Sequence, residues 1–214
     1  MNSKRKAVIS IFLLLVLCIL ALPFFKREYG DTNEFRRFKK QRVQLASVEK
    51  EQSDGNYTYA LKDGILSFKD KDGNMLWQSD AYWYVDDFSL FDVDGDGQTD
   101  CLFSLWKSYS YYKGAPKENN DKSVKNHLFL YTVKGIKAKA LWCSSNLPRP
   151  VYSFSLEDGK STSVSSGTVL KTIEGTYRDD LKQQNSHSYT YTWEGWGFVP
   201  AFSRFFEKKL GKKL

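Results

Sequence analysis

The chain has 214 residues, which is enough for one domain and an additional segment. Aromatic residues make up 16% of it, which favours a packed core over intrinsic disorder. Residues 1–50 hold eleven basic and four acidic residues and so account for the whole net charge of +7, because the 21 basic and 21 acidic residues that follow cancel. A nucleic-acid-binding domain would carry positive charge on its folded part. The distribution therefore argues against nucleic acid and favours contact with anionic membrane lipid.

Residues 7–25 are nineteen uncharged, mostly apolar residues between two basic flanks, Lys4-Arg5-Lys6 and Lys26-Arg27. This length crosses a bilayer as a helix. It exceeds the hydrophobic region of a secretory signal, about 7–15 residues, and no clear cleavage site follows. We therefore expect residues 1–25 to be a short cytoplasmic tail and an uncleaved transmembrane signal-anchor. A cleaved signal, or a lipoprotein modified at Cys18, are the alternatives.

The signals for the orientation of this helix in the membrane disagree. Residues 26–42 carry seven basic residues against three before the helix, which on strict counting places the C-terminal side in the cytoplasm. A very short basic N-terminal tail usually stays inside, and the Asp-rich segment 92–100 suits a compartment rich in divalent cations, outside the cytoplasm. We expect a single-pass membrane protein with an extracytoplasmic domain at the cell surface, a layout typical of bacteria. Residues 26–47 would form a basic stalk near the membrane, helical around 33–47.

Residues 92–100 read Asp-Val-Asp-Gly-Asp-Gly-Gln-Thr-Asp. Aspartates at 92, 94, 96 and 100 occupy positions 1, 3, 5 and 9 of a loop, and Gly97 follows the third of them, where the backbone must turn around a cation. Ca²⁺ takes six to eight oxygen ligands, and four carboxylates this close would otherwise repel one another. The spacing predicts a calcium loop; a solvated Asp/Gly turn is the alternative.

The loop is not an EF-hand, because the twelfth position, which needs a bidentate Glu, is Phe103. Its flanks, 82–85 and 88–91 before it and 101–106 after it, are short aromatic and apolar runs that are typical of strands. Residues 88–106 thus resemble the FG-GAP/VCBS repeats of integrin-α-type β-propellers, in which such a loop joins two strands of a blade. The resemblance covers about a tenth of the chain. It implies a structural Ca²⁺ bound by the side chains of Asp92, Asp94, Asp96 and Asp100 and by the backbone carbonyl of Gln98.

Internal repeats support a fold of stacked sheets. Two expected hairpins, 64–79 and 127–145, end in Leu-Trp-x-Ser with Trp77 and Trp142 at equivalent places, and a third spans 189–198. Because Trp77, Trp142 and Trp193 would belong to the repeated core, we expect them to be buried. The fold class is all-β: three to four blade-like antiparallel sheets in residues 48–206, forming a small or partial β-propeller-like domain. Some 160 residues are too few for seven blades, so a β-sandwich is an alternative.

Three further segments of the chain have sequence features from which we predict a structure or a role. Residues 156–160 follow Trp142 as the calcium loop follows Trp77, and we interpret them as a decayed copy with too few carboxylates for calcium. Residues 107–126 read as a long polar insertion and a candidate partner-binding surface. Residues 202–214 could form an amphipathic turn or a frayed end, with 207–214 as a basic tail.

Neither the cysteines nor the histidines indicate a catalytic or metal-binding site. Cys101 and Cys143 lie in expected strands and could form a disulfide in an exported domain or be two buried thiols. His127 and His187 fall in no metal or catalytic motif, and no nucleophile or phosphate-binding motif is present. The acidic residues left for a glycosidase-like pair are Asp86, Asp87, Asp179, Asp180 and Glu174. We expect no enzymatic activity.

These observations together predict a membrane-anchored, extracytoplasmic, calcium-binding scaffold or binding module that recognises a protein or a cell-envelope glycan. Its lipid contacts would be the N-terminal helix and the basic stalk. The alternative is a non-catalytic accessory subunit of an envelope complex for export or polymer synthesis.

Overall fold

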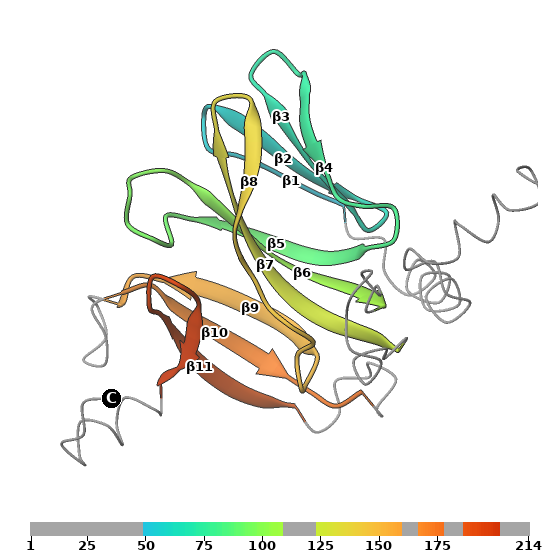
Figure 1. The fold of residues 1–214 in the computed structure, drawn as a ribbon, viewed down its shortest axis with the longest axis vertical. Helices are drawn as coiled ribbons and strands as arrows, with labels where there is room; N and C mark the ends of the chain where they lie inside the picture. The colour runs from blue at the N-terminus through green and yellow to red at the C-terminus, as the bar shows by residue number, and fades with distance from the viewer. Residues whose placement is uncertain (1–48, 109–122, 160–166, 178–185, 202–214) are drawn as a thin grey trace, which may run out of the picture.

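A computed structural model describes residues 49–108, 123–159, 167–177 and 186–201 (Figure 1). In these residues twelve strands form three antiparallel sheets of four strands each. Strands that are consecutive in the chain are neighbours within each sheet, so each sheet is an up-and-down meander. The described part of the chain is therefore all-β and built from blade-like sheets, as the sequence predicted.

The predicted membrane segment at 7–25, the stalk at 26–47 and the tail at 207–214 lie outside the described residues. Within the described residues, no helix is long and apolar enough to cross a membrane.

The first sheet precedes the acidic loop in the chain. Its second strand alternates strictly: Tyr59 and Leu61 are buried, while the residues between and beside them are partly or fully exposed. This is the pattern of a sheet with one face on the core. The strands are β1 (Lys50–Ser53), β2 (Tyr57–Lys62), β3 (Ile65–Asp70) and β4 (Met75–Gln78).

The second sheet carries the acidic loop between its first two strands. Residues 101–106 of its second strand are all buried, on both faces, which requires cover on both sides. The strands are β5 (Tyr84–Phe91), β6 (Asp100–Ser108), β7 (Val124–Lys134) and β8 (Lys137–Cys143).

The third sheet ends the described chain. Its strand β10 alternates, with Leu170 and Thr172 buried and Lys171 and Ile173 exposed, so this sheet also has one face on the core. The strands are β9 (Val151–Glu157), β10 (Val169–Glu174), β11 (His187–Trp193) and β12 (Phe198–Pro200).

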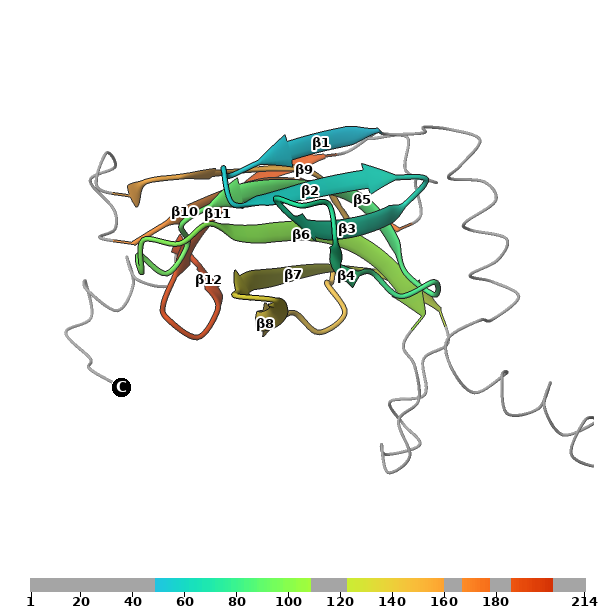
Figure 2. The same ribbon diagram turned by 90° about the horizontal axis from the view of Figure 1, so that it is seen from above.

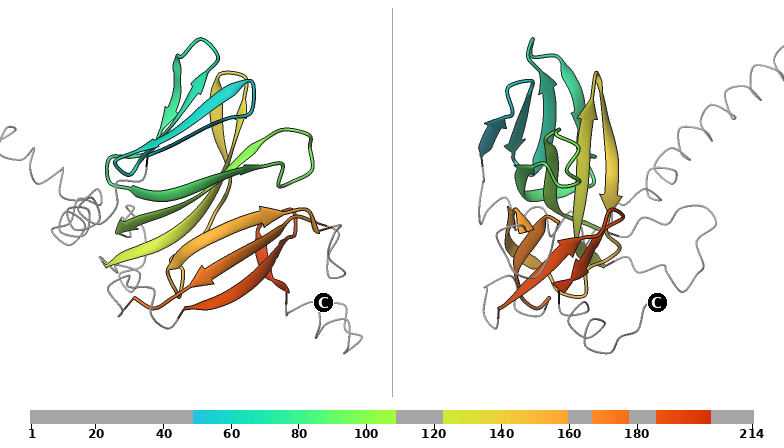
Figure 3. Two further views of the ribbon diagram at one scale, coloured as in Figure 1. Left: turned by 180° about the vertical axis from the view of Figure 1, so that it is seen from behind. Right: turned by 90° about the vertical axis from the view of Figure 1, so that its left-hand side faces the viewer.

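The second sheet lies between the other two, and each of its faces contributes to a separate hydrophobic layer (Figures 1 and 3). Phe103 and Phe129, which pair across β6 and β7, pack toward Phe68 of the first sheet. On the opposite face, Leu102 and Leu130 pack toward the third sheet. Strict alternation along β6 therefore divides one strand between two cores.

The outer faces of the first and third sheets, which point away from the second sheet, are polar. The outward positions of the first sheet include Thr58, Lys62 and Ser67, which alternate with the buried core residues. On the third sheet they include Ser153, Ser155 and Lys171, and Lys171 pairs with Glu157 at 2.8 Å. In Figure 2 the first strands β1, β5 and β9 lie on one side of the molecule, and the fourth strands β4, β8 and β12 lie on the other.

The three hairpins predicted from the repeat are the pairs of third and fourth strands, β3–β4, β7–β8 and β11–β12. The predicted insertion at 107–126 is too long, because β6 continues to Ser108 and β7 begins at Val124; the described strands leave 109–122 outside. Pairing of Lys107 with Lys125 and of Ser108 with Val124 extends the ladder into that polar sequence.

The cysteines and tryptophans follow the predictions in part. Cys101 and Cys143 are both free thiols, so the disulfide alternative is wrong; Cys101 is buried, but Cys143 is exposed, because β8 is an edge strand. Trp193 is buried, whereas Trp77 and Trp142 pack against the two hydrophobic layers only partly buried.

Candidate metal centre

The acidic loop connects β5 to β6 and is folded by hydrogen bonds from its own backbone to its aspartates. Asp92 Oδ1 accepts the N–H of Gly95 at 2.9 Å, and Asp92 Oδ2 accepts the N–H of Gly97 at 3.0 Å. Gly97 has a φ of +83°, a conformation that a residue without Cβ adopts freely. The short-range Asp–Gly pattern thus wraps the backbone around the first aspartate.

Three aspartates of the loop converge. One carboxylate oxygen from each of Asp92, Asp94 and Asp100 lies within 4.8 Å of the other two, so this triad could hold a metal ion. Asp100, the first residue of β6, is 1% exposed. Its Oδ2 accepts the N–H of Val93 at 3.1 Å, while its buried Oδ1 has no hydrogen-bond partner among the described residues.

The electrostatics of Asp100 are those of a carboxylate that lacks a counterion. Burial raises the pKa of Asp100 to about 6, although the N–H of Val93 and the hydroxyl of Thr132, its partner residue on β7, act to lower it; the neighbouring charges of Asp94 and Asp96 raise it further. A buried anion with a free oxygen is costly unless it is paired. A cation between the three carboxylates would neutralise them and supply the missing partner, so the donor set fits a hard, oxygen-binding metal ion.

Asp96 lies apart from the triad. Its Oδ2 pairs with Lys134 Nζ at 3.2 Å, and its Oδ1 accepts the backbone N–H of Gln98 at 2.9 Å. The hydrogen bond from Gln98 and the charge of Lys134 lower the pKa of Asp96. Gln98 also directs its side-chain amide to Asp96, at 3.4 Å. Of the five predicted ligands, the structure therefore gathers Asp92, Asp94 and Asp100 and pairs Asp96 with a lysine of the β7–β8 hairpin.

The loop is fixed to the third sheet at its second residue. Val93 is 2% exposed and belongs to the hydrophobic layer between the second and third sheets. Its carbonyl oxygen accepts a hydrogen bond at 2.9 Å from the hydroxyl of Thr168, which precedes β10. An aliphatic side chain in the core and a bond to a neighbouring sheet hold the acidic residues on either side in place.

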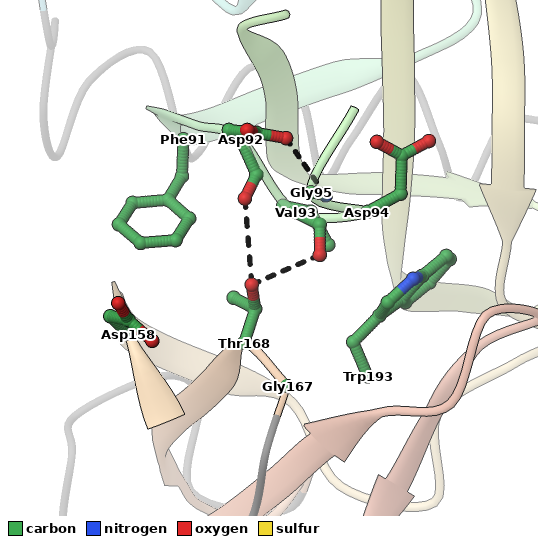
Figure 4. A pocket seen from close by; sticks show the side chains of 9 residues that line it. All are labelled: Phe91, Asp92, Val93, Asp94, Gly95, Asp158, Gly167, Thr168 and Trp193. Atoms are coloured by element: carbon green, nitrogen blue, oxygen red, sulfur yellow. Dashed lines mark hydrogen bonds between the residues drawn. The ribbon is translucent and has the colours of Figure 1, made fainter. Parts of the chain in front are cut away.

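A pocket of about 350 Å³ lies between the loop and the third sheet (Figure 4). The loop contributes Asp92 and Asp94, and the third sheet contributes Trp193 and Asp158, the aspartate of the predicted decayed copy. The complete lining is Phe91, Asp92, Val93, Asp94, Gly95, Asp158, Gly167, Thr168 and Trp193. Described residues at the end of β9 and before β10 thus face the acidic loop across one cavity with aromatic and acidic walls.

The residues considered for catalysis are placed apart from this pocket. Asp87 pairs with Lys50 at 2.8 Å, and Asp86 accepts a hydrogen bond from the indole of Trp106. Buried Glu174 accepts hydrogen bonds from the side chains of Arg149, Thr172 and Tyr191 at 2.9, 2.8 and 2.6 Å. Asp179 and Asp180 lie outside the described residues.

The two histidines have different environments. His127 is buried in the middle of β7, where its Nδ1–H donates to the carbonyl oxygen of Ser144 at 3.3 Å, and burial lowers its pKa to about 4. His187 is exposed at the start of β11.

The sequence did not predict that Thr168 and Lys134 are neighbours of the loop, nor that Phe91 of the flanking strand lines a pocket. Lys134 precedes the Gly-containing turn of a predicted hairpin, and this position at a turn was the one sequence signal that it could reach another loop. Thr168 and Val93 are 75 residues apart, and no local pattern connects them.

No protein-family model, curated protein or solved structure matches this chain. The resemblance of residues 88–106 to FG-GAP/VCBS repeats therefore stays a prediction from the loop and its flanking strands.

Proposed function

We propose that this chain is a calcium-dependent, non-catalytic binding module. The observation that carries the proposal is the buried, unpartnered oxygen of Asp100 beside Asp92 and Asp94. Ca²⁺ suits these ligands because it accepts several carboxylates with flexible geometry, and the backbone carbonyl of Gln98 and the carboxylate of Asp96 are the expected additional ligands. To bind Ca²⁺, the carboxylate of Asp96 would have to break its ion pair with Lys134.

The role of calcium in this proposal is to order a recognition surface. The loop lines the pocket of Figure 4, so a cation that locks the loop also fixes one wall of the pocket. Phe91 and Trp193 give apolar surface, and the acidic side chains give hydrogen-bond acceptors, a mixture typical of ligand sites. The ligand class is a protein segment or a cell-envelope glycan. The stacking of blade-like sheets supports a small β-propeller-like scaffold, with polar end faces in place of further blades.

The test is calcium binding by the full chain in detergent micelles. Thermal unfolding and titration calorimetry would compare the wild-type protein with Asp94→Ala and with Asp72→Ala, an exposed aspartate in the β3–β4 turn. At a calcium concentration 100 times the Kd, binding adds about 2.7 kcal/mol to the free energy of unfolding. We expect this increment in the wild-type and Asp72→Ala proteins and its loss in Asp94→Ala. No binding at millimolar calcium would refute the proposal.

We also propose that residues 7–25 anchor the module to a membrane with its domain outside the cytoplasm. The exposed thiol of Cys143 provides a probe, since Cys101 is buried. A membrane-impermeant maleimide applied to intact cells should label the wild-type chain, and Cys143→Ser should remove the label. Labelling that requires lysis would place the domain in the cytoplasm, and release of the chain by alkaline carbonate would refute the anchor.

A further inference from the structure

Two large apolar side chains are exposed in the turns that join the third and fourth strands of the second and third sheets. Ile136 and Trp196 are 76% and 73% exposed. Ile136 directly precedes β8, and Trp196 lies two residues before β12. Met75 and Ile173 are 52% and 42% exposed, but they lie within the strands β4 and β10. Single exposed apolar residues are common on proteins, but two in corresponding turns of neighbouring sheets form a candidate contact surface.

We call these two turns, β7–β8 and β11–β12, the hairpin edge. The fourth strands β8 and β12, which follow them, lie on the same side of the molecule in Figure 2. Gly197 packs on the ring of Trp142 in β8, so the β11–β12 hairpin lies against the second sheet. The hydroxyl of Tyr57 donates to the carbonyl oxygen of Gly135 at 3.0 Å, which ties the β7–β8 turn to the first sheet.

Positive charge surrounds Ile136. The β7–β8 hairpin reads Lys134-Gly135-Ile136-Lys137-Ala138-Lys139, with three exposed lysines and no acid. Lys134 pairs with Asp96, which leaves Lys137 and Lys139 as the cations beside Ile136. The β11–β12 turn carries one acid, Glu194. The edge thus combines two apolar side chains with one cationic hairpin.

We infer that the hairpin edge rests on a bilayer surface that carries anionic phospholipids. Trp and Ile at a turn can enter the headgroup region, where the indole keeps its N–H hydrated. Lys137 and Lys139 can bury their methylene chains beside them and place their ammonium groups on lipid phosphates. A lipid surface meets both chemistries at once, over turns too small and too separate to form a deep apolar pocket.

This inference rests on the membrane anchor of the proposed function. Residues 26–48, between the anchor and the described domain, number 23 and span at most about 75 Å when extended at about 3.3 Å per residue. The domain is therefore confined close to the membrane that holds residues 7–25. Confinement by a short linker raises the effective concentration of the second site to about the millimolar range, so a contact too weak to recruit a free domain can still form.

The test uses the full chain in proteoliposomes of phosphatidylglycerol with phosphatidylcholine, in which the phospholipids are brominated along their acyl chains. Bromine quenches tryptophan emission at short range. We expect Trp196→Phe to remove more than half of the quenching seen with the wild-type chain. Trp83→Phe, which changes a partly buried ring of the first hydrophobic layer, is the matched control and should remove little of it. Lys137→Glu combined with Lys139→Glu should reduce the quenching at least twofold.

Equal quenching of the wild-type and Trp196→Phe chains would overturn the inference. So would full access of aqueous iodide to Trp196 in these proteoliposomes. Protection of Trp196 from iodide without quenching by brominated lipid would assign the edge to a second copy of the chain and would also overturn it. If alkaline carbonate releases the chain from the vesicles, the anchor itself fails; if the chain is retained and Trp196 is not quenched, the inference alone fails.

Discussion

The hydroxyl of Thr168 donates a hydrogen bond to the carbonyl oxygen of Val93 at 2.9 Å, and this bond connects the third sheet to the acidic loop of the second. Val93 is buried between two aspartates of the candidate metal centre. The stability of the third sheet and the geometry of the centre are therefore coupled through one backbone carbonyl.

Thr168→Val tests this coupling, because it replaces the hydroxyl with a methyl group and leaves the buried carbonyl of Val93 without that donor. We expect a loss of about 1–2 kcal/mol in the free energy of unfolding, the usual cost of an unsatisfied buried group. Calcium affinity should fall as well, since the loop loses a fixed point. Thr190→Val, on the exposed face of β11, is the control and should change neither quantity. Urea denaturation of the full chain in micelles measures the first, and calorimetry the second.

Asp100→Asn should have opposite effects with and without calcium. Without calcium, the wild-type carboxylate is an ionised buried group at pH 7.5, because its pKa is about 6. The neutral amide removes that cost and should raise the free energy of unfolding, by on the order of 2 kcal/mol. With calcium, the variant lacks a ligand and should gain little.

The measurement for Asp100→Asn is the melting temperature with chelator and with millimolar calcium. Asp72→Asn, in the exposed β3–β4 turn, should keep the calcium increment of the wild-type chain. An Asp100→Asn variant that gains as much from calcium as the wild type would show that Asp100 is not a ligand.

How much of this architecture the sequence predicts depends on how local each signal is. The hairpins β3–β4, β7–β8 and β11–β12 combine aromatic runs with Gly-containing turns within some fifteen residues, and the structure confirms them. The edge strand β1 is missed because Lys50-Glu51-Gln52-Ser53 is polar and largely exposed, without an alternating pattern. A strand of this kind forms because β2 offers it a ladder, and that partner is not visible in its own residues.

The features of the candidate metal centre also differ in how far the sequence predicts them. The spacing of Asp92, Asp94 and Asp100 is a local property, and the structure brings these three together. The pairing of Asp96 with Lys134 depends on how β7 lies beside β6, so it needed the fold. The pocket depends on the approach of Trp193 and Asp158 from a different sheet, a contact of long sequence separation that no spacing rule contains.

Gly64→Ala should be the most destabilising small substitution in the first sheet. Gly64 has a φ of +75°, and a Cβ there would lie 2.4 Å from the ring of buried Tyr84. Backbone strain of about 1–2 kcal/mol would add to the displacement of a packed ring, for a total loss of about 3 kcal/mol or more. Gly73→Ala is the control: it has a similar φ of +83° but open space around the new methyl, so strain alone should remain. Equal losses for the two variants, measured by urea denaturation, would contradict the predicted contact with Tyr84.

His127 should make the domain sensitive to mild acid. Burial favours its neutral form and lowers its pKa to about 4, from 6.5 for an exposed imidazole. Between these values the unfolded chain binds a proton that the folded chain does not, so the free energy of unfolding falls as the pH drops from 6.5 to 4. The total loss is up to about 3 kcal/mol. Above pH 6.5 this contribution is constant.

The variant His127→Leu removes the titrating group while filling similar space. It loses the hydrogen bond to Ser144 and is less stable at neutral pH, but its unfolding free energy should decline less steeply between pH 6.5 and 4. Carboxylates that titrate in this range are common to both proteins and cancel in the difference between the two curves. His187→Leu, at an exposed site, should keep the wild-type slope. Parallel curves for the wild-type and His127→Leu proteins would mean that folding leaves the pKa of this imidazole unchanged, and would contradict the prediction.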